Sequence, residues 1–351
     1  MAEDSGLQKR VEQLEAQVKA LTDALKKAGI AAPQAGADFP RPARDGEVEV
    51  KEKSPSFGGI YDKPFLLQAG RRTFVGGYID LEFVNTEGED STFDQHRLIP
   101  FIYGDISERL KFATEIEFEH GGDVPGAGEI KIEFATLDYL FADAINFRGG
   151  IILSPLGKLN LVHDSPIQDL SFRPLVDRVI FPTTLSEAGV GFFGDFYPTE
   201  GSKLGYEIYL VNGFSGGSSE DPASVLFSTT KGVRSARGNK SEDNNNNKAF
   251  VGRMAFSPML GLELGGSFHV GNWDDEDDNT LAIYGFDVTF QHGPFELLAE
   301  YGIADVELSD AIKASNTAGT SDIPEDLTGY YVQANYHFMP SFIEDAVPFI
   351  T

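Results

Sequence analysis

The chain has 351 residues, of which 41% are hydrophobic and 24% charged, and its formal net charge is -27. This charge argues against nucleic acid or an anionic membrane surface as a partner, because both require basic patches. No apolar run approaches the roughly 18 residues of a transmembrane helix, which excludes a helical membrane protein. The chain has no cysteine, so disulfides, thiolate metal sites and cysteine nucleophiles are excluded as well.

Residues 1–29 are predicted to form a helix with a coiled-coil seam. A seam of about three heptads is marginal alone and predicts self-association or a partner. An amphipathic helix lying on its own domain is the alternative. Residues 30–71, rich in Ala, Pro and Gly at their start, are interpreted as a linker. The seam consists of Leu7, Val11, Leu14, Val18, Leu21 and Leu25.

From about residue 72 the apolar pattern changes to period two, which indicates β-strands. In the first such segment, Val75, Ile79 and Leu81 form an apolar face, while Asp80 and Glu82 lie on the other. Strands of about ten residues suit a tilted crossing of a bilayer, whereas strands of a soluble sandwich are usually nearer five or six. About twelve strands are predicted, starting near residues 73, 94, 110, 129, 146, 190, 204, 247, 262, 280, 294 and 328.

The predicted connections alternate in length, being mostly short after even strands and longer after odd strands. This asymmetry is typical of outer-membrane barrels. We therefore expect residues 72–351 to form an antiparallel transmembrane β-barrel in contact with outer-membrane lipid, with the N-terminal helix in the periplasm. No signal peptide precedes the barrel, so a mature chain is expected. Residues 347–350 resemble a thirteenth strand cut short, which predicts a longer native barrel of about sixteen strands.

Three segments carry a resemblance to a known family. They are the strand and Pro-x-Gly exit at 147–160, the glycine-rich start of the first strand at 76–78, and the strand at 206–213. Together with the N-terminal coiled coil, these segments resemble the phosphate-selective porin O and P family. The resemblance implies a homotrimeric diffusion channel with a constricting loop folded into the lumen.

The connection at 155–189 is the candidate for such a constriction loop, with an ordinary outer loop as the alternative. Its basic residues Lys158, Arg173 and Arg178 are mixed with acidic residues and cannot be matched to the family's basic positions. Phosphate selectivity is therefore not carried over.

Alternation also predicts the side chains that line the pore. The inward acids are Asp80, Glu82, Glu115, Glu117, Glu119, Glu133, Glu207, Glu263, Asp287, Glu296 and Glu300, and their basic companions are Lys111, Lys131, Arg148 and Arg253. An acid excess in a pore raises the local concentration of cations, which predicts a cation-preferring or weakly selective channel for small solutes or ions. In the alternative, these acids pair with the basic residues and only stiffen the wall.

The sequence predicts no enzyme, cofactor or metal site. Ser267 and His269 neighbour each other, but no orienting acid or oxyanion motif accompanies them. Two classes of function remain: a diffusion channel, and a structural outer-membrane anchor whose periplasmic coiled coil is the working part.

Overall fold

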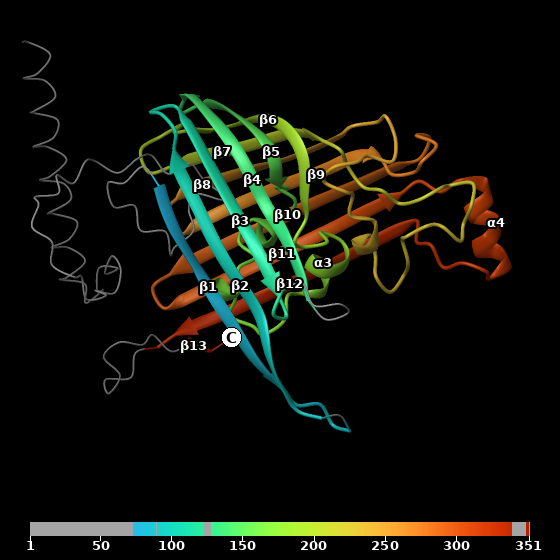
Figure 1. Cartoon of the computed structure of the whole chain (residues 1–351). Helices are drawn as coiled ribbons and strands as arrows, with labels where there is room; N and C mark the ends of the chain where they lie inside the picture. The colour runs from blue at the N-terminus through green and yellow to red at the C-terminus, as the bar shows by residue number, and fades with distance from the viewer. Residues whose placement is uncertain (1–72, 89, 123–127, 339–348, 351) are drawn as a thin grey trace, which may run out of the picture. The chain divides into compact units, whose positions relative to one another are not determined.

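The computed structural model describes residues 73–88, 90–122 and 128–338, and the backbone of 349–350. The predicted coiled-coil helix and linker lie outside these residues. Thirteen strands form one antiparallel sheet in which every strand pairs with its neighbours in chain order (Figure 1). The strands are β1 (Thr73–Val84), β2 (Thr92–Asp105), β3 (Leu110–Glu119), β4 (Glu129–Ala142), β5 (Ile145–Leu153), β6 (Ser186–Phe196), β7 (Lys203–Val211), β8 (Ala249–Met259), β9 (Leu262–Asn272), β10 (Thr280–His292), β11 (Phe295–Val306), β12 (Asp326–His337) and β13 (Phe349–Ile350).

The twelve predicted strands are confirmed, and each begins within four residues of its expected start. The alternation of connections is also confirmed. Two residues separate β4 from β5, β8 from β9 and β10 from β11, whereas residues 154–185, 212–248 and 307–325 form the long connections. The connection at 307–325 contains α4 (Asp310–Ala318), which begins after the Ser309 cap and ends at Gly319 in a left-handed conformation.

The outer face of the sheet is apolar. Val75, Ile79 and Leu81 of β1 expose 75%, 71% and 65% of their surfaces. The same exposure recurs in later strands, as at Phe286 of β10 and Val332 of β12. A sheet that turns its apolar residues outward in this way has the surface that a lipid environment favours.

Among the described residues, no helix is long and apolar enough to cross a membrane.

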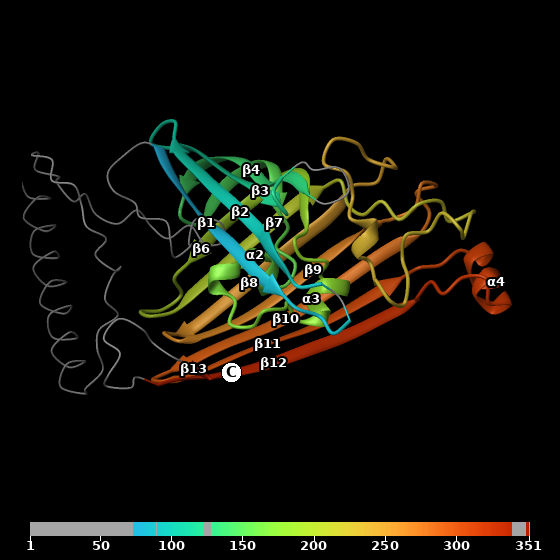
Figure 2. The ribbon, with the colours of Figure 1, turned by 60° about the horizontal axis from the view of Figure 1, so that its bottom comes forward.

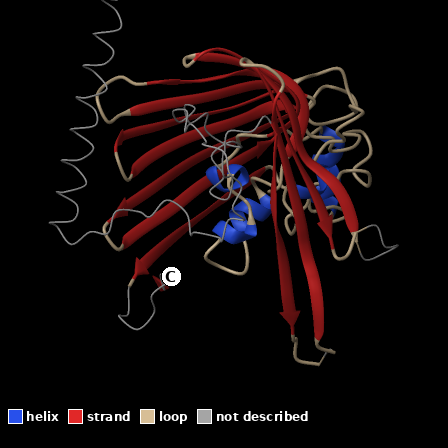
Figure 3. Cartoon of the chain, turned by 60° about the vertical axis from the view of Figure 1, so that its left-hand side comes forward, coloured by secondary structure: helices blue, strands red, loops and turns tan. Residues whose placement is uncertain are grey.

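The concave face of the sheet is covered by residues 154–185, which we call the inward segment (Figures 2 and 3). This segment contains three short helices, namely α2 (Lys158–Leu161), the 3-10 helix η2 (Ser165–Ile167) and α3 (Leu175–Val179). Two apolar clusters lie beneath it and beside it, one around Phe101 and Phe134 and the other around Phe181 and Trp273. The inner wall is therefore charged in some places and apolar in others, and apolar inward residues pack against the segment.

Replacing Phe286 by Arg tests whether the outer face contacts lipid. Phe286 lies in the middle of β10 and is 59% exposed. A charge on the lipid face near the midplane costs about 2 to 4 kcal/mol, so the free energy of unfolding in lipid vesicles should fall by that amount. Phe286→Leu is the matched control and should change it little. An equal stability of both variants in vesicles would contradict a lipid-facing surface.

Candidate functional site

The start of the inward segment is hydrogen-bonded to strands β9 and β11. The Gly157 amide donates to Ser267 Oγ at 3.0 Å. The Lys158 amide donates to Glu300 Oε1 at 2.7 Å, and the Lys158 ammonium lies 3.1 Å from Glu263 Oε1. The predicted loop residue Lys158 is therefore ion-paired with a predicted wall acid.

The middle of the inward segment contacts both ends of the long meander. The Ser165 amide donates to the Tyr78 hydroxyl of β1 at 3.4 Å. Asp169 Oδ2 accepts hydrogen bonds from the side-chain amides of Gln333 and Asn335 of β12, each at 2.6 Å. One connection thus contacts strands from β1 to β12, so it crosses the concave side.

A row of three glycines seats α3. Gly285, Gly302 and Gly329 lie directly opposite one another on β10, β11 and β12. The Phe181 ring and Val176 pack on this row, and a Cβ atom at Gly302 would lie 2.7 Å from Phe181 Cζ. Because glycine has no side chain, the inward segment can approach the sheet closely at these three positions.

Between the inward segment, β3, β4 and the long connection at 212–248 lies a cavity of about 440 Å³, which we call the first hollow. Its charged lining includes more cations than anions. The cations are Arg97, Lys131, Arg173, Arg234, Arg237 and Lys240, and the anions are Glu117, Glu119, Glu129 and Glu133.

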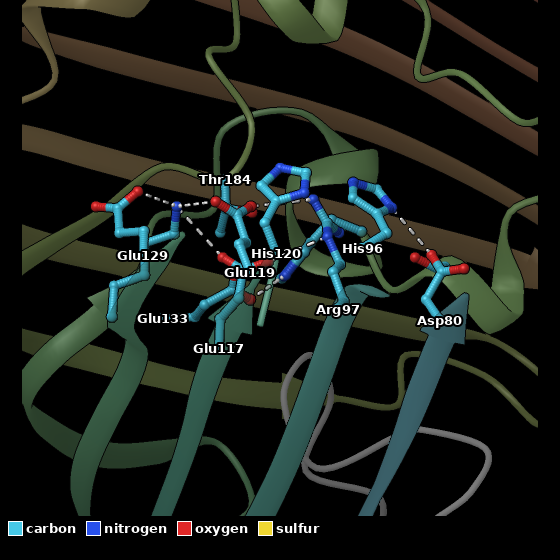
Figure 4. Close-up of polar contacts among 12 residues, drawn as sticks. Asp80, His96, Arg97, Glu117, Glu119, His120, Glu129, Glu133 and Thr184 are labelled. Atoms are coloured by element: carbon cyan, nitrogen blue, oxygen red, sulfur yellow. Dashed lines mark hydrogen bonds and ion pairs between the residues drawn. The ribbon is translucent and has the colours of Figure 1, made fainter. Parts of the chain in front are cut away.

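Three acids of the first hollow, Glu117, Glu119 and Glu129, are paired with strand cations (Figure 4). Arg97 Nε lies 3.1 Å from Glu117 Oε1. Lys131 Nζ lies 3.4 Å from Glu117 Oε2 and 3.1 Å from Glu119 Oε2. Glu115, Glu117 and Glu119 follow one another on the concave side of β3. Glu117 and Glu119 are nevertheless paired with these two cations, which corresponds to the alternative in which wall acids and bases pair.

The loop arginines of the first hollow are bound differently. Arg173 and Arg234 donate to the Thr183 carbonyl at 3.2 and 2.6 Å, and Arg237 donates to the Thr184 carbonyl at 2.9 Å. Within the described ranges, these three guanidinium groups have no carboxylate within 4.0 Å. Burial, followed by the nearby positive charge of Arg237, lowers the pKa of Arg234 to about 10. Positive charge is thus concentrated here without direct neutralisation.

A second cavity of about 470 Å³, the second hollow, lies on the other side of Arg97 and Arg173. The predicted loop residue Arg178 lines it, as do Asp80 and Glu82 of β1. His96 Nδ1 lies 3.2 Å from Asp80 Oδ2 and 3.1 Å from Glu82 Oε1. Two of the predicted wall acids therefore share one histidine.

The other predicted wall residues form separate groups away from the two hollows. Arg148 is buried and pairs with Asp138 at 2.8 Å and with Glu207 at 3.3 Å. A further group joins Arg253 to Asp287 at 2.6 Å and to Glu263 at 3.1 Å.

Two remaining predicted residues lie nearer the ends of strands. Lys111 pairs with Asp105 at 2.7 Å, beside a short turn. Glu296 lies 3.1 Å from His337. All fifteen predicted wall residues thus lie on the concave side or at its rim, but the structure does not bring them together into one ring.

Sequence reasoning missed Arg97, Arg234 and Arg237. Arg97 shares its face of β2 with the buried Ile99, Phe101 and Tyr103, so alternation in that strand does not mark the face as polar. Arg234 and Arg237 come from the 212–248 connection, which has no periodicity to show where a side chain points. The one available signal was the clustering of basic residues at 231–240 in an otherwise acidic chain.

The curved antiparallel meander, the apolar outer face and the charged concave face crossed by the inward segment define a porin-like outer-membrane β-barrel fold. No family model matches the chain, so the resemblance to phosphate-selective porins stays a prediction. An uncharacterized protein of Aquifex aeolicus (strain VF5) is 32% identical over an alignment of 293 positions, and the match covers 78% of this chain. The chain spans 64% of the length of that relative.

Several solved outer-membrane proteins have a distantly similar structure. Salmonella typhi OmpF, solved with daunomycin, is 14% identical with a TM-score of 0.43, over 76% of this chain and 73% of its own. The outer-membrane channel DcaP of Acinetobacter baumannii is 11% identical with a TM-score of 0.35, over 76% and 86%. Pseudomonas aeruginosa OccK11 is 12% identical with a TM-score of 0.33, over 68% and 62%. These similarities are too distant to carry an argument about function.

Replacing Gly302 by Leu tests the seat of the inward segment. The new side chain would clash with Phe181 and Val176, and such overpacking costs about 1 to 3 kcal/mol. We expect faster proteolytic cleavage within residues 154–185, measured on the folded protein in detergent. Gly266→Leu is the control, because nothing lies within 4 Å of a Cβ atom there. Equal cleavage rates in both variants would contradict this packing.

Proposed function

We propose that the protein is an outer-membrane channel for the diffusion of small hydrophilic solutes or ions. The observation that carries this proposal is the pair of charged hollows on the concave side, beside a segment that crosses from β1 to β12. A protein needs no such polar cavities to hold an apolar outer face in lipid, whereas charged linings determine which solutes enter a pore.

We further propose that ion selectivity is weak. The expectation of cation preference depends on free inward acids, and Glu117 and Glu119 of the first hollow are paired with Arg97 and Lys131. The loop arginines that remain without a carboxylate partner act in the opposite direction, toward anions. Acids and bases line the same cavity of about 440 Å³, and a charge acts over about one Debye length, roughly 8 Å at physiological salt. An ion in this cavity therefore experiences both signs of charge.

Two parts of the proposal concern assembly and placement. Location in the bacterial outer membrane with the N-terminal helix in the periplasm, and assembly as a homotrimer through the seam of residues 1–29, remain proposals. The second candidate function is an anchor whose barrel conducts nothing. If the protein is only an anchor, the purified protein in a planar bilayer should give no current steps. If it is a channel, it should give discrete conductance steps.

Replacing Arg173, Arg234 and Arg237 by Gln tests the origin of selectivity. Removing three cations that have no carboxylate partner should shift the reversal potential in a salt gradient toward cations, because it leaves the acids of the first hollow in excess. The control changes the same number of charges outside the hollows, with Lys203, Lys231 and Lys248 replaced by Gln. An equal shift in both variants would contradict a role for the first hollow in conduction.

The converse test replaces Glu115, Glu117 and Glu119 by Gln. This change removes Glu117 and Glu119 as partners of Arg97 and leaves Lys131 paired with Glu129, so the reversal potential should move toward anions. Removing one partner of a buried pair costs about 3 to 5 kcal/mol, so the unfolding midpoint of this variant should be recorded beside the current. A movement toward cations would contradict the assignment of these acids to the conducting path.

A further inference from the structure

A buried group of two carboxylates and one histidine joins the inward segment to the wall. His163 of the segment, Glu115 of β3 and Glu133 of β4 expose 0%, 0% and 2% of their surfaces. Each offers one ligand atom, and these atoms lie within 4.8 Å of one another. Glu133 stands beside Glu117 on the neighbouring strand (Figure 4).

The hydrogen bond of the His163 ring fixes which nitrogen faces the acids. His163 Nδ1 lies 2.9 Å from the Asn160 carbonyl oxygen, which only accepts, so Nδ1 carries a proton. The other nitrogen, Nε2, lies 2.5 Å from Glu133 Oε2 and 3.9 Å from Glu115 Oε1. Nε2 and the facing carboxylate oxygens all carry lone pairs. They therefore repel one another unless a proton or a cation lies between them.

The charges around this group favour a cation of higher charge than a proton. Glu117 pairs with Arg97 and Lys131, whereas the buried carboxylates of Glu115 and Glu133 both lie close to the His163 imidazole. Glu133 Oε1 is buried and has no hydrogen-bond partner within the described structure. Because an uncompensated buried charge is costly, a doubly charged ion would balance the two carboxylates where one proton balances only one of them.

The surroundings of His163 are also those of a metal ligand. The side chain of Asn160 is fixed by hydrogen bonds to Ser154 and Leu185, so the carbonyl that orients the imidazole has a fixed position. A backbone carbonyl bound to the far ring nitrogen in this way is typical of metal-bound histidine. Glu133 also lines the first hollow, which gives an ion access from solvent.

We propose that Glu115, Glu133 and His163 bind a divalent transition-metal ion, with Zn²⁺ as the best match, and that this ion ties the inward segment to β3 and β4. Imidazole together with carboxylate oxygens is a ligand set of Zn²⁺. The site has no signature in the sequence, because its three residues are separated by 18 and 30 positions and match no metal motif. The proposal does not require that the protein be a channel.

The test uses the full chain folded in detergent, stripped with a chelator and dialysed against Zn²⁺. We expect one tightly held zinc ion per chain by mass spectrometry. His163→Gln and Glu115→Gln should each weaken binding by about 100-fold or more, since even changes to residues that only support the ligands cost 10- to 100-fold. His269→Gln is the matched control, because this buried histidine pairs with the single carboxylate of Glu187.

Two further measurements locate the zinc ion within the protein. X-ray absorption of the zinc-loaded wild type needs no substitution and should show one imidazole among oxygen ligands. His96→Gln removes the half-exposed group with Asp80 and Glu82 and should leave the tight zinc ion bound. Loss of the ion in His96→Gln but not in His163→Gln, or a wild type that retains no zinc, would overturn the proposal.

Discussion

The structure depends on the alternation of side chains along each strand, because successive side chains point to opposite faces of the sheet. One of these two faces is apolar. A charge on a lipid-facing position is costly, so the charged strand residues occur on the concave face. There they are crowded into a limited space, and acids placed side by side would repel one another. The ion pairs of Arg97, Arg148 and Arg253 with neighbouring acids reduce this repulsion.

The inward segment fits within this charge arrangement. Its Lys158 forms an ion pair with Glu263, and its backbone amides donate to Oε1 of the buried Glu300. The segment therefore neutralises part of the wall while narrowing the space within it. Burial of Asp177 beside Glu300 raises the pKa of Asp177 well above its usual range. The shift favours the neutral form of Asp177 beside Glu300.

Much of the fold was predictable because alternation is a local property of the sequence. Val75 and Ile79 on one face, and Glu117 and Glu119 on the other, need no long-range information. Pairing is different, because it depends on which strands become neighbours and on where a bulge shifts the register, as between Asp80 and Glu82.

The expectation of cation preference came from counting charges along strands. Such a count cannot show that Arg234 and Arg237, from a connection without periodicity, would reach the same cavity as the acids. The metal-like group at His163 was missed for a similar reason, because its carboxylates come from other strands.

The glycine row on β10, β11 and β12 has a consequence for the order of assembly. The inward segment follows β5, yet its seat is formed by residues more than a hundred positions later in the chain. Contacts of such sequence separation form late, because the entropy of closing the intervening chain must be offset first. The first half of the sheet therefore forms before the glycine row on which the inward segment packs. Folding intermediates of this protein should expose residues 154–185 to proteases until the last strands have paired.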